Sequence, residues 1–86
     1  MTADTAGRWQ VYILRCGDGS LYTGITNNIE QRIIDHNAGT CAKYTRSRLP
    51  VKLIYSETVE DKSSALQREA AIKKLTRAAK LELIRS

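Results

Sequence analysis

Apolar and turn-forming residues alternate along the chain in a pattern that predicts strands at three places. Aromatic and β-branched residues fill positions 9–14, a polar loop with two glycines occupies 16–20, and the apolar character returns at 21–25. Two such runs around a short glycine-containing loop are typical of a β-hairpin. Pro50 then precedes an apolar alternation over residues 51–55, which predicts the third strand.

Helical spacing predicts three helices. The first covers about residues 28–38, with Asn27 and Glu30 at the offset of a capping box and Gly39 just past its end. Its apolar side consists of Ile29, Ile33 and Ile34. A second helix is expected from its cap Asp61 to Leu75, and a third over residues 77–84 from its cap Thr76.

The expected order of elements is β-β-α-β-α-α, with a loop from Thr40 to Pro50. A hairpin cannot bury both of its faces alone, so three strands with helices packed on them predict an α+β fold, an α/β sandwich. Eighty-six residues fit one small domain, which we place at residues 9–86 behind a loose tail at residues 1–8.

Charge and composition narrow the class of protein. Fourteen Lys and Arg against nine Asp and Glu give a formal charge of +5, which favours a polyanionic partner such as nucleic acid. No apolar run reaches the ~18 residues that cross a bilayer, and residues 1–6 lack the features of a signal peptide, so a cytoplasmic protein without membrane contact is expected. Cys16 and Cys41 cannot build a disulfide framework or, with one histidine, a zinc site, and are expected to be reduced thiols.

Two tyrosines of the hairpin are the first candidates for chemistry. If the loop is centred on Asp18, Tyr12 faces Gly24, and Tyr22 is its diagonal neighbour on the same face, with β-carbons ~7 Å apart. Gly24 would leave room beside the Tyr12 ring for backbone or ligand. The pair alone favours a structural role, because tyrosines often anchor the edge of a core.

Arg32 and His36 lie four residues apart and therefore on one side of the first helix. A guanidinium there can bind a phosphate and stabilise the charge that builds up on it, and an imidazole can take or relay a proton near neutral pH. Taken singly, each residue fits a solvated surface side chain better.

Glu69 is the sharpest single signal, because its helical neighbours Ala65, Leu66 and Ile72 place it in an apolar stripe. A buried carboxylate needs a cation, either Arg or Lys in a structural pair or a bound Mg²⁺ or Mn²⁺. The residue pattern by itself favours the structural pair over the metal.

A basic segment over residues 43–48 combines cations with an aromatic ring and hydroxyl groups, a mixture that can hold phosphates and stack on a base. Residues 62–86 carry most of the remaining positive charge. The candidate nucleic-acid-binding residues are Lys43, Tyr44, Arg46, Arg48 and Lys73.

In this order and spacing, the residues resemble the GIY-YIG nuclease superfamily, and most closely its small single-domain bacterial subgroup. The resemblance covers about residues 9–84 and includes the strand at 11–14, the stretch 21–25, Arg32, His36, residues 43–48, and 68–73 with Glu69. Two triplets depart from the family pattern, Gln-Val-Tyr at 10–12 and Tyr-Thr-Gly at 22–24, but both tyrosines and the closing glycine remain.

The resemblance implies a three-stranded antiparallel sheet flanked by helices, and divalent-metal-dependent cleavage of phosphodiester bonds in DNA. It further implies that Glu69 binds Mg²⁺ or Mn²⁺, that Arg32 contacts the scissile phosphate, and that Tyr12 or Tyr22 helps to deprotonate the attacking water. A phenol has an ordinary pKa of ~10, so a phenolate at neutral pH would need a nearby cation. Ile25 stands where some members carry a lysine that could activate the base, which leaves activation to His36 or the metal.

The leading expectation is therefore a metal-dependent endonuclease acting on DNA, with low intrinsic sequence specificity because the chain has no room for a separate recognition domain. A role in DNA repair or processing, with a protein partner for targeting, would suit such an enzyme. The first alternative is a nucleic-acid-binding module with little or no nuclease activity. The second is a protein-interaction module whose basic helices bind an acidic partner.

Overall fold

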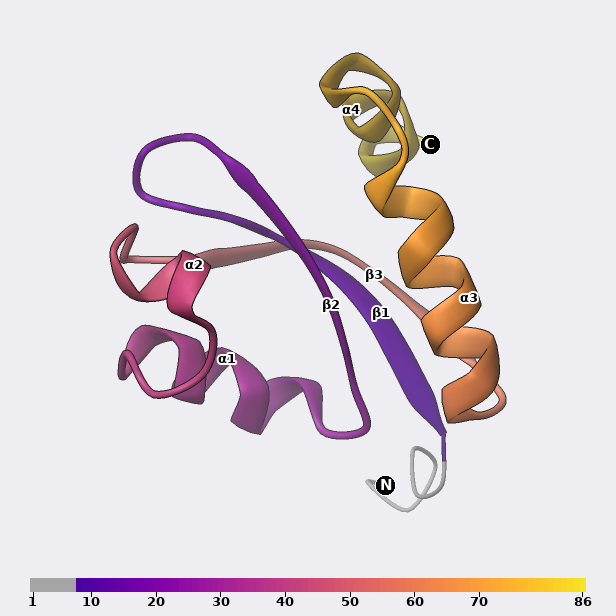
Figure 1. Ribbon diagram of the computed structural model, residues 1–86, viewed down its shortest axis with the longest axis horizontal. Helices are drawn as coiled ribbons and strands as arrows, with labels where there is room; N and C mark the ends of the chain where they lie inside the picture. Colours follow the sequence, from indigo (N-terminus) through magenta and orange to yellow (C-terminus); the bar gives the residue numbers. More distant parts are fainter. Residues whose placement is uncertain (1–7) are drawn as a thin grey trace.

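The computed structural model describes residues 8–86 (Figure 1), so residues 1–7 of the expected tail lie outside the described part of the chain. The fold is α+β, as the sequence predicts, with the element order β-β-α-α-β-α-α. The elements are β1 (Trp9–Arg15), β2 (Leu21–Thr26), α1 (Ile29–Asn37), α2 (Lys43–Arg46), β3 (Lys52–Val59), α3 (Lys62–Lys73) and α4 (Arg77–Arg85).

The sheet is antiparallel and has β1 in the centre, in the order β2-β1-β3. Tyr12 pairs with Gly24 and Leu14 pairs with Tyr22, which confirms the predicted register of the hairpin. The third strand runs to Val59 rather than ending at residue 55. It extends because β1 provides backbone partners along its length, while polar side chains of the added residues can face solvent.

Helices cover both faces of the sheet, and alternate side chains of β1 supply the two halves of the core (Figure 1). Val11 and Ile13 pack with residues of α3 and α4. Tyr12 and Leu14 point to the other face and pack with residues of α1. This alternation fixes which face of the sheet carries the tyrosines.

The caps of the helices agree with the sequence at three ends and differ at one. The side chains of Asp61 and Thr76 accept backbone hydrogen bonds at the starts of α3 and α4, and Gly39 after α1 has a φ of +77°. The cap of α1, however, is Asn28 and not Asn27, because the Asn28 side chain accepts from the Gln31 amide. None of the helices within residues 8–86 has the length and hydropathy needed to span a membrane.

The expected loop at residues 40–50 contains a further helix, α2, so the prediction of three helices was wrong at this point. The helix is only four residues long and has no side-chain cap, which left no signal in the sequence. The helix contributes to tertiary packing, because it buries Thr45 against α1. Helix α3 also ends at Lys73, before the predicted Leu75.

Candidate active site

A buried hydrogen bond between Tyr12 of β1 and His36 of α1 lies at the centre of the candidate site. The Tyr12 hydroxyl is 2.9 Å from His36 Nε2, and the two side chains are 2% and 0% exposed. The alternative of a surface histidine is therefore excluded. A buried polar pair of this kind is stable only when both partners are satisfied.

Helix α2 determines which ring nitrogen of His36 carries the hydrogen. The Thr45 hydroxyl donates its hydrogen to the Ala42 carbonyl oxygen and lies 2.8 Å from His36 Nδ1. Since this hydroxyl has one hydrogen to donate, it accepts from the Nδ1–H group. Nε2 therefore has a free lone pair, and it accepts the hydrogen of the Tyr12 hydroxyl.

Gly24 makes the position of Tyr12 possible. A Cβ atom at residue 24 would lie 2.6 Å from the Tyr12 hydroxyl oxygen and 2.7 Å from Cζ. The Tyr12 ring therefore crosses directly over β2 at this glycine, which is its partner in the sheet. The glycine is needed for its lack of a side chain, as the sequence suggested.

Tyr22 and Arg32 lie beside this pair. The Tyr22 ring centroid is 6.4 Å from that of Tyr12 and 5.3 Å from that of His36. Arg32 is half-buried, and its Nη1 donates to the Cys41 sulfur at 3.2 Å. The Cys41 sulfur is also 3.5 Å from His36 Nε2, so this cysteine contacts both candidate residues of α1.

Burial determines the charge state of the site. It raises the pKa of Tyr12, assisted by the neighbouring Tyr22 and opposed by Arg32, and it also raises the pKa of Tyr22. Burial, and then the nearby Arg32 charge, lower the pKa of His36. Near neutral pH the site therefore holds two neutral phenols and a neutral imidazole beside one guanidinium.

Glu69 of α3 is the last of the predicted catalytic residues. Its carboxylate contributes to the raised pKa of both Tyr12 and Tyr22, after burial, and so lies within electrostatic reach of the two phenols. The side chain is 19% exposed, and Oε2 lies 3.2 Å from Lys73 Nζ. The predicted apolar stripe is wrong at Leu66, which is 48% exposed, so Glu69 lies at the border of the core.

The residues expected to bind nucleic acid differ in their availability. Lys43 and Arg46 are exposed. Tyr44 and Arg48 are engaged with other side chains at the surface. Tyr44 is 39% exposed and its ring stacks on Tyr22, and the Arg48 guanidinium lies 4.0 Å from the Tyr44 centroid. Lys73 is the ion-pair partner of Glu69.

Sequence reasoning missed Thr45 and Cys41 as members of the site. Thr45 was one hydroxyl within a basic segment, and Cys41 was read as a thiol without a role. The spacing of Cys41 from Arg32 and His36 gave no signal, because the contact forms only when the chain turns back after Gly39.

Comparison with known proteins shows the family to which the chain belongs. The model of the GIY-YIG catalytic domain matches residues 8–82, and the chain therefore belongs to the GIY-YIG family. A UPF0213 protein of Clostridium perfringens is 63% identical over 76 residues, which are 88% of this chain and 82% of the relative. A UPF0213 protein of Natronomonas pharaonis is 53% identical over 74 residues, or 86% of this chain and 87% of that protein.

Solved structures of two relatives have a similar fold. The UPF0213 protein of Bacillus halodurans has a TM-score of 0.58 and 42% identity, covering 90% of this chain and 82% of its own. A protein of E. faecalis has a TM-score of 0.59 and 44% identity, covering 88% and 82%. The fold and family are thus shared over most of the chain.

Proposed function

We propose that the protein is a divalent-metal-dependent endonuclease that hydrolyses phosphodiester bonds in DNA with low intrinsic sequence specificity. The observation that carries the proposal is the buried hydrogen bond from Tyr12 to His36 Nε2. A hydroxyl group aligned on a basic nitrogen can pass a proton from water to the imidazole. Membership of the GIY-YIG family supports a nuclease, and the net charge of +5 supports a nucleic-acid substrate.

Tyr12 acts in this proposal as a neutral relay and not as a phenolate. Because burial raises its pKa, the phenol keeps its proton at neutral pH. The Tyr12 oxygen accepts a proton from the attacking water while the phenol hydrogen moves to His36 Nε2. The neutral state of His36 favours this transfer, since Nε2 is then free to take the proton.

In this proposal Arg32 binds the scissile phosphate. One terminal nitrogen is held by Cys41, and a guanidinium has further N–H donors with the fork geometry that matches phosphate oxygens. Its charge is close enough to lower the pKa of His36. The same charge would offset the negative charge that builds up on the phosphoryl group in the transition state.

Glu69 fits a magnesium site that the substrate completes. No group of three or more His, Cys, Asp or Glu side chains within residues 8–86 forms a ready metal centre. Mg²⁺ commonly keeps several waters and binds through one or two carboxylates together with substrate phosphates, so one half-buried carboxylate is sufficient. The bound ion would supply positive charge at the phosphate and at the leaving oxygen.

The alternative is a nucleic-acid-binding module with little or no nuclease activity. The exposed cations Lys43 and Arg46 favour it, since they can contact phosphates without any chemistry. The ion pair with Lys73 also gives Glu69 a structural explanation. The two functions differ in whether the Glu69 carboxylate is needed for turnover.

The test compares cleavage of labelled duplex, single-stranded and branched DNA by the wild type and three variants, with Mg²⁺, Mn²⁺ or EDTA. Glu69→Gln removes the charge that would bind the metal. Lys73→Ala is the matched control, because it breaks the same ion pair and leaves the carboxylate. Glu82→Gln removes an exposed carboxylate of α4, which is paired with Arg85.

We expect metal-dependent cleavage that falls by at least ~100-fold in Glu69→Gln and persists in the two control variants. Equal losses in Glu69→Gln and Lys73→Ala would instead identify the ion pair as structural. Absence of cleavage in the wild type, with salt-sensitive DNA binding in all four proteins, would establish the binding module.

A further inference from the structure

Three side chains stack in sequence next to the candidate active site. The Arg48 guanidinium carbon lies 4.0 Å from the centroid of the Tyr44 ring. The Tyr44 ring stacks on Tyr22 with centroids 5.8 Å apart and planes at 28°. Tyr22 in turn lies 5.3 Å from the His36 ring, so the stack ends at the site.

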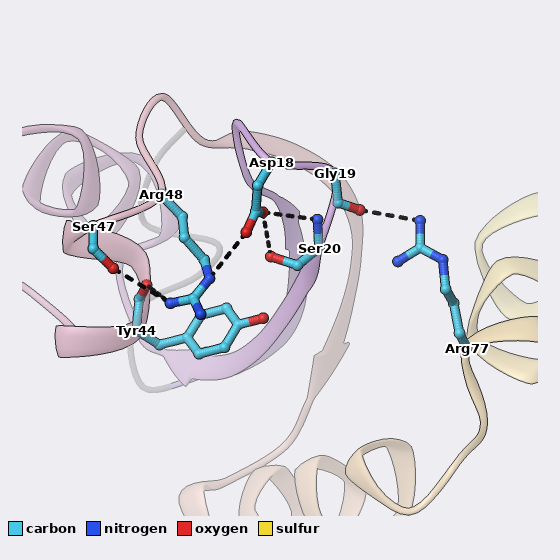
Figure 2. A network of polar contacts seen from close by, with 7 residues as sticks. All are labelled: Asp18, Gly19, Ser20, Tyr44, Ser47, Arg48 and Arg77. Atoms are coloured by element: carbon cyan, nitrogen blue, oxygen red, sulfur yellow. Dashed lines mark hydrogen bonds and ion pairs between the residues drawn. The ribbon is translucent and has the colours of Figure 1, made fainter.

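The hydrogen bonds of Arg48 are made to other groups of the protein at its surface (Figure 2). Nε donates to Asp18 Oδ2 at 3.1 Å, and Nη1 donates to the Tyr44 carbonyl at 2.9 Å and to the Ser47 hydroxyl at 3.3 Å. Two of the three guanidinium nitrogens, which a phosphate-binding arginine would present to its ligand, thus have partners within the protein. Arg46, two residues earlier, is exposed and has no ion pair within the described residues.

Asp18 is itself held in place by the hairpin loop (Figure 2). Its Oδ1 accepts from the Ser20 amide at 3.0 Å and from the Ser20 hydroxyl at 2.6 Å, and these bonds, followed by the Arg48 charge, lower the pKa of Asp18. The Gly17 amide donates to the Arg48 carbonyl at 2.7 Å. A Cβ atom at Gly17 would lie 2.6 Å from the Leu49 carbonyl oxygen, so the two loops approach closely.

From this geometry we propose that Asp18, Arg48 and Tyr44 are positioning residues for Tyr22. The ion pair with Asp18 fixes the guanidinium of Arg48, the guanidinium holds the Tyr44 ring, and that ring keeps Tyr22 beside His36. The assignment rests on the proposed nuclease function, because it concerns the same site. It replaces phosphate binding as the role of Arg48 and base stacking as the role of Tyr44.

The test uses the difference between a planar guanidinium and an ammonium group. Arg48→Lys keeps the positive charge but cannot stack flat on Tyr44, whereas Arg48→Ala removes both the charge and the stacking. Tyr44→Phe keeps the ring, and Arg46→Ala removes an exposed cation as the control. Cleavage kinetics give kcat and KM, and DNA binding is measured as a function of salt concentration. NMR of the free proteins records the ring-proton shifts of Tyr22, which depend on the aromatic ring stacked on it.

We expect Arg48→Lys to lower kcat by ~10- to 100-fold at unchanged KM, with an unchanged salt dependence and shifted Tyr22 resonances. Tyr44→Phe should retain kcat and the Tyr22 resonances. Arg46→Ala should retain kcat, raise KM, and make the slope of log affinity against log salt less steep by about 0.9.

The proposal is overturned if Arg48→Lys behaves as the wild type while Arg48→Ala raises KM and reduces the salt slope, since Arg48 would then bind phosphate. It is also overturned if the Tyr22 resonances are the same in the wild type, Arg48→Lys and Arg48→Ala. The NMR measurement needs no DNA. A wild type that does not cleave would thus refute the proposed function, while the spectra would still decide whether Arg48 positions Tyr22.

Discussion

The hydroxyl of Tyr12 and Nε2 of His36 are joined by a buried hydrogen bond, although 24 residues separate them in the sequence. Tyr12 comes from the central strand and His36 from the helix that packs on that face of the sheet. Loss of one partner would leave the other polar group buried without its hydrogen bond, which costs ~1–3 kcal/mol. The bond therefore connects the stability of the fold with the chemistry of the site.

Removing the hydroxyl of Tyr12 should lower the rate of cleavage more than removing the hydroxyl of Tyr22. Tyr12→Phe eliminates the atom that relays a proton to His36, and a general acid or base contributes ~10²–10⁴-fold to rate. Tyr22→Phe keeps the ring that stacks on Tyr44. Single-turnover cleavage of both variants measures the difference. A Tyr22→Phe defect larger than that of Tyr12→Phe would assign the base to Tyr22.

Acidic pH should reduce both the stability and the activity of the protein through His36. Its pKa is lowered in the folded state by burial and then by Arg32, while the unfolded chain retains the ordinary value of 6.5. The unfolded state therefore binds more protons as the pH falls below about 6.5, and the free energy of unfolding decreases. Above this pH the contribution of the neutral imidazole is fully present.

The measurement is urea unfolding between about pH 5 and pH 8, with kcat/KM recorded over the same range. His36→Gln, which has no titratable group, should lack this component of the pH dependence. The phenol of Tyr12 adds no loss in this range, because a pKa raised by burial costs stability only as the pH rises above the ordinary value of 10.0. Identical acid limbs in the wild type and His36→Gln would refute the role of His36.

Gly24→Ala should damage the site through Tyr12. The new Cβ atom would approach the Tyr12 hydroxyl within 2.6 Å, and overpacking of this kind costs ~1–3 kcal/mol. Urea unfolding and cleavage should both show a loss. Gly19→Ala is the control, because its cost of ~1–2 kcal/mol arises from a φ of +85° with no atom within 4 Å of the added Cβ.

The Gly19→Ala variant should therefore lose stability but retain cleavage at a temperature where it is folded. Full activity of Gly24→Ala would show that the Tyr12 hydroxyl can move without consequence, which would contradict the relay.

Arg32→Lys should lower the rate of cleavage although the positive charge is retained. A lysine cannot present the paired N–H groups of a guanidinium to a phosphate. The substitution also removes the hydrogen bond from the Arg32 guanidinium to the Cys41 sulfur. We expect kcat to fall by ~100-fold with little change in DNA affinity. Arg85→Lys at the end of α4 is the exposed control. Unchanged kcat in Arg32→Lys would remove Arg32 from the proposed chemistry.

Local patterns in the sequence determined the hairpin, its register and most helix ends. Tyr12 had to face Gly24 once the loop was centred on Asp18, because side chains alternate along paired strands. Asp61 and Thr76 could be assigned as caps because a capping bond joins residues only a few positions apart. The four-residue spacing of Arg32 and His36 likewise gave their common side of α1.

Only the tertiary structure decided which of these residues meet. The contacts of His36 with Tyr12 and Thr45, and of Arg48 with Asp18, join segments whose separation in the sequence carries no periodic signal. The same packing showed that Arg48 is paired with Asp18 and that Glu69 borders the core, although the sequence placed one among free cations and the other in the apolar stripe. Periodicity gives the face on which a side chain lies, whereas burial and partners depend on how distant elements pack.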